Sequence, residues 1–318
     1  MKGVKPFRIV VAEPFAPEAL ARLEQVGHVT LLENSSPDSM IRALPDADAL
    51  LVKSRAHVTA RIIEAGRNLK VIGRASSTID HIDLRAARRR DICVVYTPNA
   101  TVNSTAEFVI ATALLLNRRI FYYDQQIREG RFDVARHPSG HEFGRRTLGL
   151  LGVDLVAERV AEIASSAFGS TIIHHDPLPE ASSSKPGEAV ILEELLQRAD
   201  FLSVHARLTP ETRGILNRDT LALMKKDAIV INVTRGALID TEALAEALQT
   251  RTLGGAAIDV FESEPLPLHH PLRRAPNCIL TPHIAGATLD ATDGRFTVTE
   301  DVVRVLEGKM PQYPAYPA

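Results

Sequence analysis

The sequence predicts an α/β protein with two domains, each built on a doubly wound parallel sheet. Short apolar runs alternate with helical periodicity from residue 8 to residue 98, and this alternation resumes after residue 146. The apolar runs are continuous, which is typical of parallel strands covered by helices on both faces. At 318 residues the chain is long enough for two cores. We therefore expect two Rossmann-like or flavodoxin-like domains with a ligand cleft between them.

The first domain is expected to begin close to the N-terminus. Its predicted strands are 8–14, 28–33, 48–54, 69–75 and 92–98, with helices at 17–27, 38–45, 59–66 and 81–91 between them. A last helix at 299–308 stands after the second sheet is complete, so we expect it to return to the first domain. The predicted first domain is therefore discontinuous and consists of residues 1–100 and 289–318.

A long helix over 103–132 is predicted to lead out of the first domain. Asn103 or Ser104 is expected to cap it, with Glu107 three residues after Ser104 as in a capping box. The polar segment 133–146 is as consistent with packing on a partner subunit as with a surface loop. The second domain, 101–288, continues with helices at 189–199, 218–225 and 241–250 and strands at 200–206, 228–234, 254–260 and 277–283.

The stretch 146–177 has the pattern of a strand, a tight turn, a helix and a second strand, the unit that holds a dinucleotide. Gly152 begins the turn, and Asp176 follows it at about the 20-residue spacing expected of a ribose-binding carboxylate. Asp154 and Ala157 stand where the second and third glycines would be. Because the second glycine lets the backbone approach a diphosphate, Asp154 adds bulk and a repelling charge there. Because this stretch lies within it, 101–288 is the predicted dinucleotide-binding domain. The first domain is therefore the predicted substrate-binding domain.

Composition argues against several kinds of partner. The formal net charge of −2 gives no basic footprint for nucleic acid or an anionic membrane. No apolar run approaches the roughly 18 residues of a membrane span, and the first strand follows no apolar leader. Cys93 and Cys278 lie in strand-like contexts, which favours buried free thiols and a reducing compartment. We expect a cytoplasmic protein with no metal site.

Three polar side chains follow predicted strands of the second domain, at the edge where parallel sheets bind ligands. They are Arg235, Glu264 and His283. An arginine offers a fixed fork for a carboxylate, and a histidine can exchange an alcohol proton near neutral pH. A glutamate bonded to that histidine would fix its tautomer. Each residue alone is more often a surface or turn residue, but together they suit interconversion of a 2-hydroxy acid and a 2-oxo acid beside a nicotinamide.

Nearly the whole chain resembles the D-isomer-specific 2-hydroxyacid dehydrogenase family. The matching stretches lie in both predicted domains, and together they are more specific than any one motif. They are VIGRA and DHIDL (71–84), NSTAE (103–107), RTLGLLG (146–152), HHDP (174–177), SVHARLTPETRGIL (203–216), NVTRGALID (232–240), AAIDVFESEP (256–265) and TPHIAGAT (281–288).

The resemblance implies an NAD-dependent oxidoreductase acting on a small-molecule 2-hydroxy or 2-oxo acid. Its catalytic arginine falls on Arg235, its acid on Glu264 and its acid–base histidine on His283. It also implies a homodimer formed through the cofactor domain, with the 120–146 excursion as its arm.

The same resemblance places the cofactor contacts. The adenosine-ribose carboxylate falls on Asp176, the nicotinamide-side aspartate on Asp259 and a helix-start hydroxyl on Thr105. The remaining expected contacts come from the turn, the strand ends and the loops after them: Gly152, Asp154, Leu155, Val156, His205, Ala206, Arg207, Thr212, Val233, Thr234 and Gly286.

Within the family, KSRAHVT (53–59) and the absence of a long C-terminal extension resemble short 3-phosphoglycerate dehydrogenases. Lys53, Arg55 and Arg74 would then face a substrate carboxylate or phosphate, and the alternative is that they are surface charges flanking strand ends. The family's glycine-containing substrate loop is replaced by three hydroxyl residues, which can also donate to a carboxylate. These residues are Ser76, Ser77 and Thr78.

Two functions are compatible with the sequence. The first is an active dehydrogenase, which is favoured by the joint presence of the catalytic and cofactor residues Arg235, Glu264, His283, Asp176 and Asp259. The second is a catalytically degenerate homologue that acts as a ligand-binding or regulatory module, because Asp154 alters the dinucleotide turn. Arg207 stands where the family usually has a proline, and it either pairs with Asp154 or a phosphate or faces solvent.

Overall fold

The computed structural model describes residues 6–53, 55–133, 140–178 and 186–316. The chain divides into two compact units, one formed by residues 1–101 and 288–318 and the other by residues 102–287. Among the described residues, no helix is both long enough and apolar enough to cross a bilayer.

The first unit is built on a five-stranded parallel sheet with the order β2-β1-β3-β4-β5. The strands are short and their apolar side chains alternate between the two faces, so both faces need a covering layer. Their bounds are β1 Phe7–Val11, β2 Gly27–Leu31, β3 Ala49–Val52, β4 Val71–Arg74 and β5 Cys93–Tyr96.

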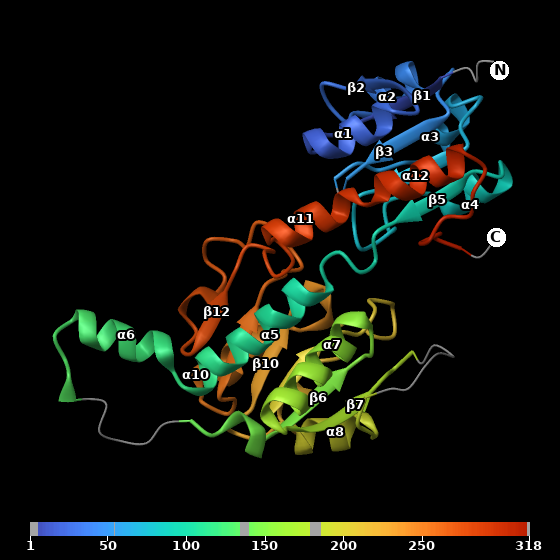
Figure 1. Ribbon diagram of the computed structural model, residues 1–318. Helices are drawn as coiled ribbons and strands as arrows, with labels where there is room; N and C mark the ends of the chain where they lie inside the picture. The colour runs from blue at the N-terminus through green and yellow to red at the C-terminus, as the bar shows by residue number, and fades with distance from the viewer. Residues whose placement is uncertain (1–5, 54, 134–139, 179–185, 317–318) are drawn as a thin grey trace. The chain divides into compact units, whose positions relative to one another are not determined.

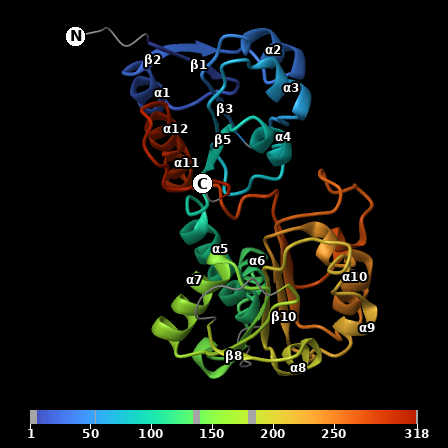
Figure 2. The same ribbon diagram turned by 90° about the vertical axis from the view of Figure 1, so that its right-hand side faces the viewer.

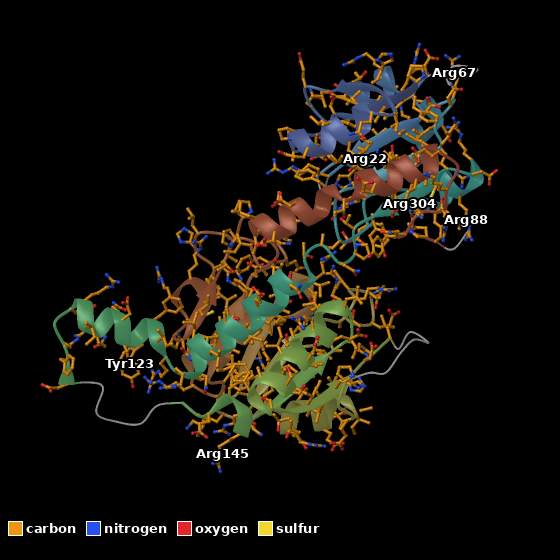
Figure 3. All side chains as sticks on the ribbon, in the orientation of Figure 1. Arg22, Arg67, Arg88, Tyr123, Arg145 and Arg304 are labelled. Carbon is orange, nitrogen blue, oxygen red and sulfur yellow. The ribbon has the colours of Figure 1, made fainter. Side chains whose placement is uncertain are left out.

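Helices cover both faces of this sheet (Figure 2). One face packs against α2 Pro37–Ala43, α3 Ala60–Ala65 and α4 Leu84–Arg89, and the other against α1 Pro17–Glu24 and α12 Val298–Leu306. A further helix, α11, spans Leu289–Phe296. The C-terminal helix α12 approaches β4 so closely that a Cβ on Gly73 would lie 2.5 Å from Val302 Cγ2. Arg22 on α1 also pairs with Glu300 on α12 at 3.0 Å (Arg22 is labelled in Figure 3).

The second unit contains a seven-stranded sheet with the order β12-β11-β10-β9-β6-β7-β8, and its paired strands are parallel. The strand order reverses between β6 and β9, which is the switch point where α/β sheets bind ligands. The strands are β6 Thr147–Leu151, β7 Thr171–His175, β8 Glu188–Ala189, β9 Phe201–Val204, β10 Ile229–Asn232, β11 Gly255–Ile258 and β12 Cys278–Leu280.

Two layers of helices cover this second sheet, as Figures 1 and 2 show. The helices α5 Val102–Asn117 and α7 Leu155–Ile163 pack on one face. The helices α8 Leu192–Arg198, α9 Arg218–Leu221 and α10 Thr241–Gln249 pack on the other. Single-turn helices complete the unit: η2 Phe143–Arg145, the π-type η3 Ala164–Phe168, η4 Gly236–Leu238 and η5 Pro271–Arg274. The predicted fold class, two Rossmann-like parallel-sheet domains, is confirmed.

The predicted long helix over 103–132 is wrong in two respects. It is two helices, because Arg119 adopts a left-handed conformation with φ 51° between α5 and α6 Ile120–Arg128. The core contacts of α5 end at Leu116, so nothing buried holds the next turn in line with it. The expected N-cap is also wrong. The helix α5 begins at Val102, so Asn103 and Ser104 lie inside its first turn. Residues 134–139 of the predicted excursion lie outside the described residues.

Candidate active site

The candidate catalytic residues follow three neighbouring strands of the second unit. In these strands Asn232 of β10 is opposite Ile258 of β11, and Ile258 is opposite Leu280 of β12. The carboxyl ends of parallel strands meet at one edge of a sheet. The segments that carry Arg235, Glu264 and His283 therefore leave the sheet side by side.

The imidazole of His283 and the carboxylate of Glu264 contact each other directly. His283 Nδ1 lies 3.2 Å from Glu264 Oε2, and the two side chains are 59% and 42% exposed. The other carboxylate oxygen, Oε1, accepts a hydrogen bond of 3.1 Å from the backbone N–H of Phe261, which orients the carboxylate. When Nδ1 carries a proton it donates to Glu264, and Nε2 then faces away from Glu264 and can exchange a proton with a ligand.

Asp259 organises the loop that carries His283. Its side chain is 1% exposed. Its carboxylate accepts from the Thr281 hydroxyl at 2.6 Å and from the backbone N–H groups of Ile284 and Ala285 at 2.8 Å each. The backbone N–H of His283 itself donates to Asp259 O at 2.9 Å. Because these bonds fix the chain on both sides, they stabilise the left-handed conformation of His283, at φ 59°.

Arg235 reaches the same segment through its neighbour Gly236. A Cβ on Gly236 would lie 2.0 Å from the carbonyl carbon of Phe261, so the two backbones are in close contact and only glycine fits. Arg235 Nη1 donates to Thr234 O at 2.8 Å, and the Asn232 side chain donates to Arg235 O at 2.9 Å. These contacts bring the Arg235 segment against the backbone that leads to Glu264.

The dinucleotide turn between β6 and α7 keeps the geometry that its first glycine requires. Gly152 has φ 86°, and a Cβ there would lie 2.4 Å from Ala206 N, so its backbone packs against the end of β9. Gly152 N donates to His175 O at 2.7 Å, which places Asp176 beside the turn. Asp176 Oδ1 accepts from Leu178 N at 3.2 Å. The position of Asp176 therefore suits a ribose hydroxyl.

Asp154 is the N-cap of α7. Its Oδ1 accepts from Ala157 N at 2.8 Å and lies 3.3 Å from His205 Nδ1. Burial acts to raise the pKa of this carboxyl, but the His205 ring and the backbone N–H groups of Ala157 and Val156 outweigh it, so its pKa lies below the ordinary value. The sequence analysis offered Arg207 as a partner of Asp154 and did not anticipate that His205 is its neighbour. Arg207 is exposed.

The other expected cofactor residues surround this turn and the strand ends. Thr212 is buried and shapes the loop after β9, because its hydroxyl donates to Arg207 O at 2.7 Å and accepts from Thr209 N at 2.8 Å. Thr234 donates to Val204 O at 3.3 Å, which ties the end of β10 to β9. Thr105 and Ala206 are buried, Val156, Val233 and Gly286 are half-buried, and Leu155 is exposed.

The expected substrate residues belong to the first unit. Arg55 is exposed, Ser76 is buried, and Ser77 and Thr78 are half-buried. Arg55 follows β3, and the three hydroxyl residues follow β4. The last residue of β4, Arg74, is 2% exposed and has Nη2 3.4 Å from His81 Nδ1. The ring of His81 stacks on His57 at a centroid distance of 3.9 Å, a pair that the sequence analysis missed.

Lys53, the remaining cation expected near the substrate, is engaged by other groups of its own unit. Its ammonium group donates to Pro14 O at 3.0 Å and lies 5.5 Å from the ring centroid of Phe296. In the described part of the chain, no group of three or more His, Cys, Asp or Glu side chains is placed to hold a metal ion.

Comparison with known proteins defines the class of this chain. Residues 110–285 match the family described as "D-isomer specific 2-hydroxyacid dehydrogenase, NAD binding domain". The chain belongs to the D-isomer-specific 2-hydroxyacid dehydrogenase family, and this segment is its NAD-binding domain.

Individual relatives have different names and lengths. The chain is 38% identical to D-3-phosphoglycerate dehydrogenase of Methanocaldococcus jannaschii over 95% of its own length and 58% of that protein. It is 36% identical to glyoxylate reductase of Thermofilum pendens, covering 95% of this chain and 91% of that one. The crystal structure of the TT0316 protein from Thermus thermophilus is 36% identical, with a TM-score of 0.84 over 98% of this chain and 100% of that one.

The chain thus spans little more than half of the phosphoglycerate dehydrogenases that it matches and nearly all of the glyoxylate reductase. NAD is the cofactor of the matched domain. The residues fit it well at Gly152 and Asp176. At the N-terminus of α7, however, the carboxylate of Asp154 accepts from a backbone N–H of the kind that commonly binds phosphate groups.

Replacing Asp259 by asparagine should lower the free energy of unfolding by about 1–3 kcal/mol, because an amide N–H would face the backbone donors that now meet a carboxylate oxygen. The urea-unfolding midpoint measures this loss. Asp219→Asn makes the same change at an exposed position of the same unit and should stay within about 0.5 kcal/mol of the parent. Equal midpoints for the two variants would contradict the organising role of Asp259.

Proposed function

We propose that this chain is an NAD(H)-dependent oxidoreductase that interconverts a small 2-hydroxy acid and its 2-oxo acid. The observation that carries this proposal is the pairing of His283 with Glu264 beyond β11 and β12, inside an NAD-binding domain. The Glu264 carboxylate is oriented toward His283 because its second oxygen accepts from the backbone N–H of Phe261, an arrangement not expected of an isolated surface histidine. The intact pair favours an enzyme over a degenerate binding module.

The proposed roles follow from the chemistry of each side chain. His283 Nε2 gives a proton to the carbonyl oxygen of a 2-oxo acid or takes it from the hydroxyl of a 2-hydroxy acid, and Glu264 supports the charge that develops on the ring. Arg235 offers its guanidinium fork to the carboxylate of the acid. A bound nicotinamide supplies or accepts the hydride.

The proposed substrate contacts of the first unit are Arg55, Ser76, Ser77 and Thr78, with Arg74 and Lys53 as further cations near the strand ends. Support comes from the buried guanidinium of Arg74, two residues before the first hydroxyl residue, Ser76. Cationic and hydroxyl groups suit acids that carry a phosphate or a second polar group. We propose a phosphoglycerate-like acid as the substrate. Hydroxypyruvate, glyoxylate and lactate-like acids, which offer fewer groups to bind, are the alternatives.

We also propose that the chain forms a homodimer through the cofactor domain, with residues 120–146 as the arm. The helix α6 extends away from the sheet of its own unit (Figure 1), and Gln126 is the buried residue of this helix. Ile120, Tyr123 and Ile127 recur at helical spacing and share one face (Tyr123 is labelled in Figure 3). Ile120 is 46% exposed, Ile127 50% and Phe132 78%. A second copy is proposed to cover this face.

A reducing, cytoplasmic setting is also proposed. Cys93 and Cys278 are both free, and burial raises the pKa of the Cys278 thiol to about 12, which makes it unreactive.

His283→Ala should lower turnover of NADH with a responsive 2-oxo acid by about 100-fold or more, because the variant cannot deliver the proton. Glu264→Gln should cause a smaller loss, since the ring remains. Turnover is measured by NADH absorbance on a panel of glyoxylate, hydroxypyruvate, pyruvate and 3-phosphohydroxypyruvate. The exposed His28→Ala on β2 is the matched control and should keep parental activity. Activity near the parental level in His283→Ala would remove the proposed mechanism.

Asp176→Ala should narrow the preference for NADH over NADPH by about tenfold or more, because the carboxylate that repels the 2′-phosphate is gone. The ratio of kcat/KM for the two cofactors reports this change. Glu193→Ala removes an exposed carboxylate from α8 and should leave the ratio as it is. A parent enzyme that uses both cofactors equally would show that Asp176 is not at the ribose.

Ile120→Glu combined with Ile127→Glu should convert the dimer to a monomer, because a stable interface needs roughly 800 Å² per partner and cannot bury two unpaired charges. Sedimentation equilibrium gives the molecular mass. Leu31→Glu places the same charge on an exposed apolar residue of β2 in the first unit and should leave the dimer intact. A monomeric parent would refute the proposed assembly.

A further inference from the structure

The N-terminus of α7 is occupied by a side chain of its own chain. Asp154 has extended backbone angles, φ −117° and ψ −179°, which turn its carboxylate back over the first turn of the helix. Its Oδ1 accepts from Ala157 N at 2.8 Å. The N–H groups at the start of this helix are those that hold a dinucleotide diphosphate in Rossmann-type domains. The carboxylate and a diphosphate therefore need the same donors.

A second donor points to the same place from the neighbouring strand. The side chain of His205, at the end of β9, is fully buried, and within the described residues its Nδ1 has no hydrogen-bond partner. This atom lies 3.3 Å from Asp154 Oδ1, within ion-pair distance but outside hydrogen-bond geometry. Nε2 of the same ring is 2.7 Å from the hydroxyl of Ser203, which is 0% exposed, so the ring cannot turn away.

Together, these two groups form a site for an anion. A hydroxyl proton donated by Ser203 to Nε2 leaves the ring proton on Nδ1, facing the start of α7. The imidazole N–H and the helix N–H groups then converge on one position. Gly152 keeps the adjacent backbone within reach, because a Cβ at this residue would collide with Ala206 N at 2.4 Å. Asp154 places a single negative charge at that position.

We propose that Asp154 is an intramolecular competitor of the cofactor diphosphate: its carboxylate and the diphosphate bind the α7 N–H groups and the His205 edge in turn. NAD binds when the Asp154 side chain rotates into solvent. The side chain is 45% exposed, so it has an open route to water. The proposal rests on the NAD-dependent function proposed above and makes Asp154 a residue that sets cofactor affinity.

Competition predicts two opposite effects of removing the carboxylate. The helix loses its cap, which lowers stability, while the diphosphate gains the donors, which raises cofactor affinity. A residue that only caps the helix would change stability without affinity. A residue that helps to hold the cofactor would lose affinity when removed. Opposite signs in the two measurements are therefore specific to competition.

Two substitutions at Asp154 separate charge from capping. Asparagine caps a helix about as well as aspartate but carries no charge, and alanine removes both cap and charge. Asp240→Ala is the matched control, because Asp240 caps α10 in the same unit by accepting from Glu242 N and Ala243 N. Each full-length variant is titrated with NADH by fluorescence and unfolded thermally without nucleotide.

We expect Asp154→Asn to bind NADH about tenfold more tightly than the parent, with a melting temperature close to the parental value; tenfold is about 1.4 kcal/mol. Asp154→Ala should bind at least as tightly and melt about 2–4 °C lower. Asp240→Ala should melt lower as well, with parental NADH affinity.

Unchanged or weaker NADH binding in both Asp154 variants would overturn the proposal, and so would a lack of binding to all four proteins at millimolar NADH. Failure of the proposed function is distinguishable from these results. Asp154→Asn that binds NADH more tightly but reduces none of the 2-oxo acids would refute the dehydrogenase activity and leave the competition standing.

Discussion

The buried carboxylate of Asp259 is the constraint on which the candidate active site depends. A carboxylate at 1% exposure is stable only when its oxygens are satisfied, and here the donors all come from the loop after β12. These bonds fix the loop, and His283 is held at a left-handed φ of 59°, which few non-glycine residues adopt. Glu264 meets a ring whose position is already fixed. The energy of a buried polar network is thus used to orient an exposed pair.

Much of the fold could be predicted from the sequence because its signals are local. Continuous apolar runs separated by helical periodicity indicate a parallel sheet covered on both faces, and the strands β4, β9, β10, β11 and β12 lie within the predicted ranges. The pairing of His283 with Glu264 could also be predicted in outline. Strand ends in a doubly wound sheet converge at one edge, so polar residues that follow neighbouring strands lie close together.

What the sequence could not predict depends on competition between partners. The helix break at Arg119 has no glycine or proline that would have predicted it. It follows from the end of the buried face of α5. Asp154 reads equally well as a misfit in a dinucleotide turn and as a helix cap, and the choice rests on the direction of one side chain. His205 was expected among the cofactor contacts, but its position 3.3 Å from the carboxylate of Asp154 depends on the directions of both side chains. The organising role of Asp259 required the loop geometry, because its donors are mostly backbone groups.

The C-terminal helix α12 has a consequence for the order in which the chain becomes structured. It covers one face of the first sheet, where its Val302 lies close to Gly73 of β4. An ion pair between Arg22 and Glu300 joins it to α1. Of all these elements, a ribosome releases this helix last. That face of the amino-terminal strands is therefore covered only by α1 while residues 102–287 are synthesised. The second unit needs none of the later residues for its own core. Synthesis and folding thus run in opposite orders along this chain, and the unit that is made first is completed last.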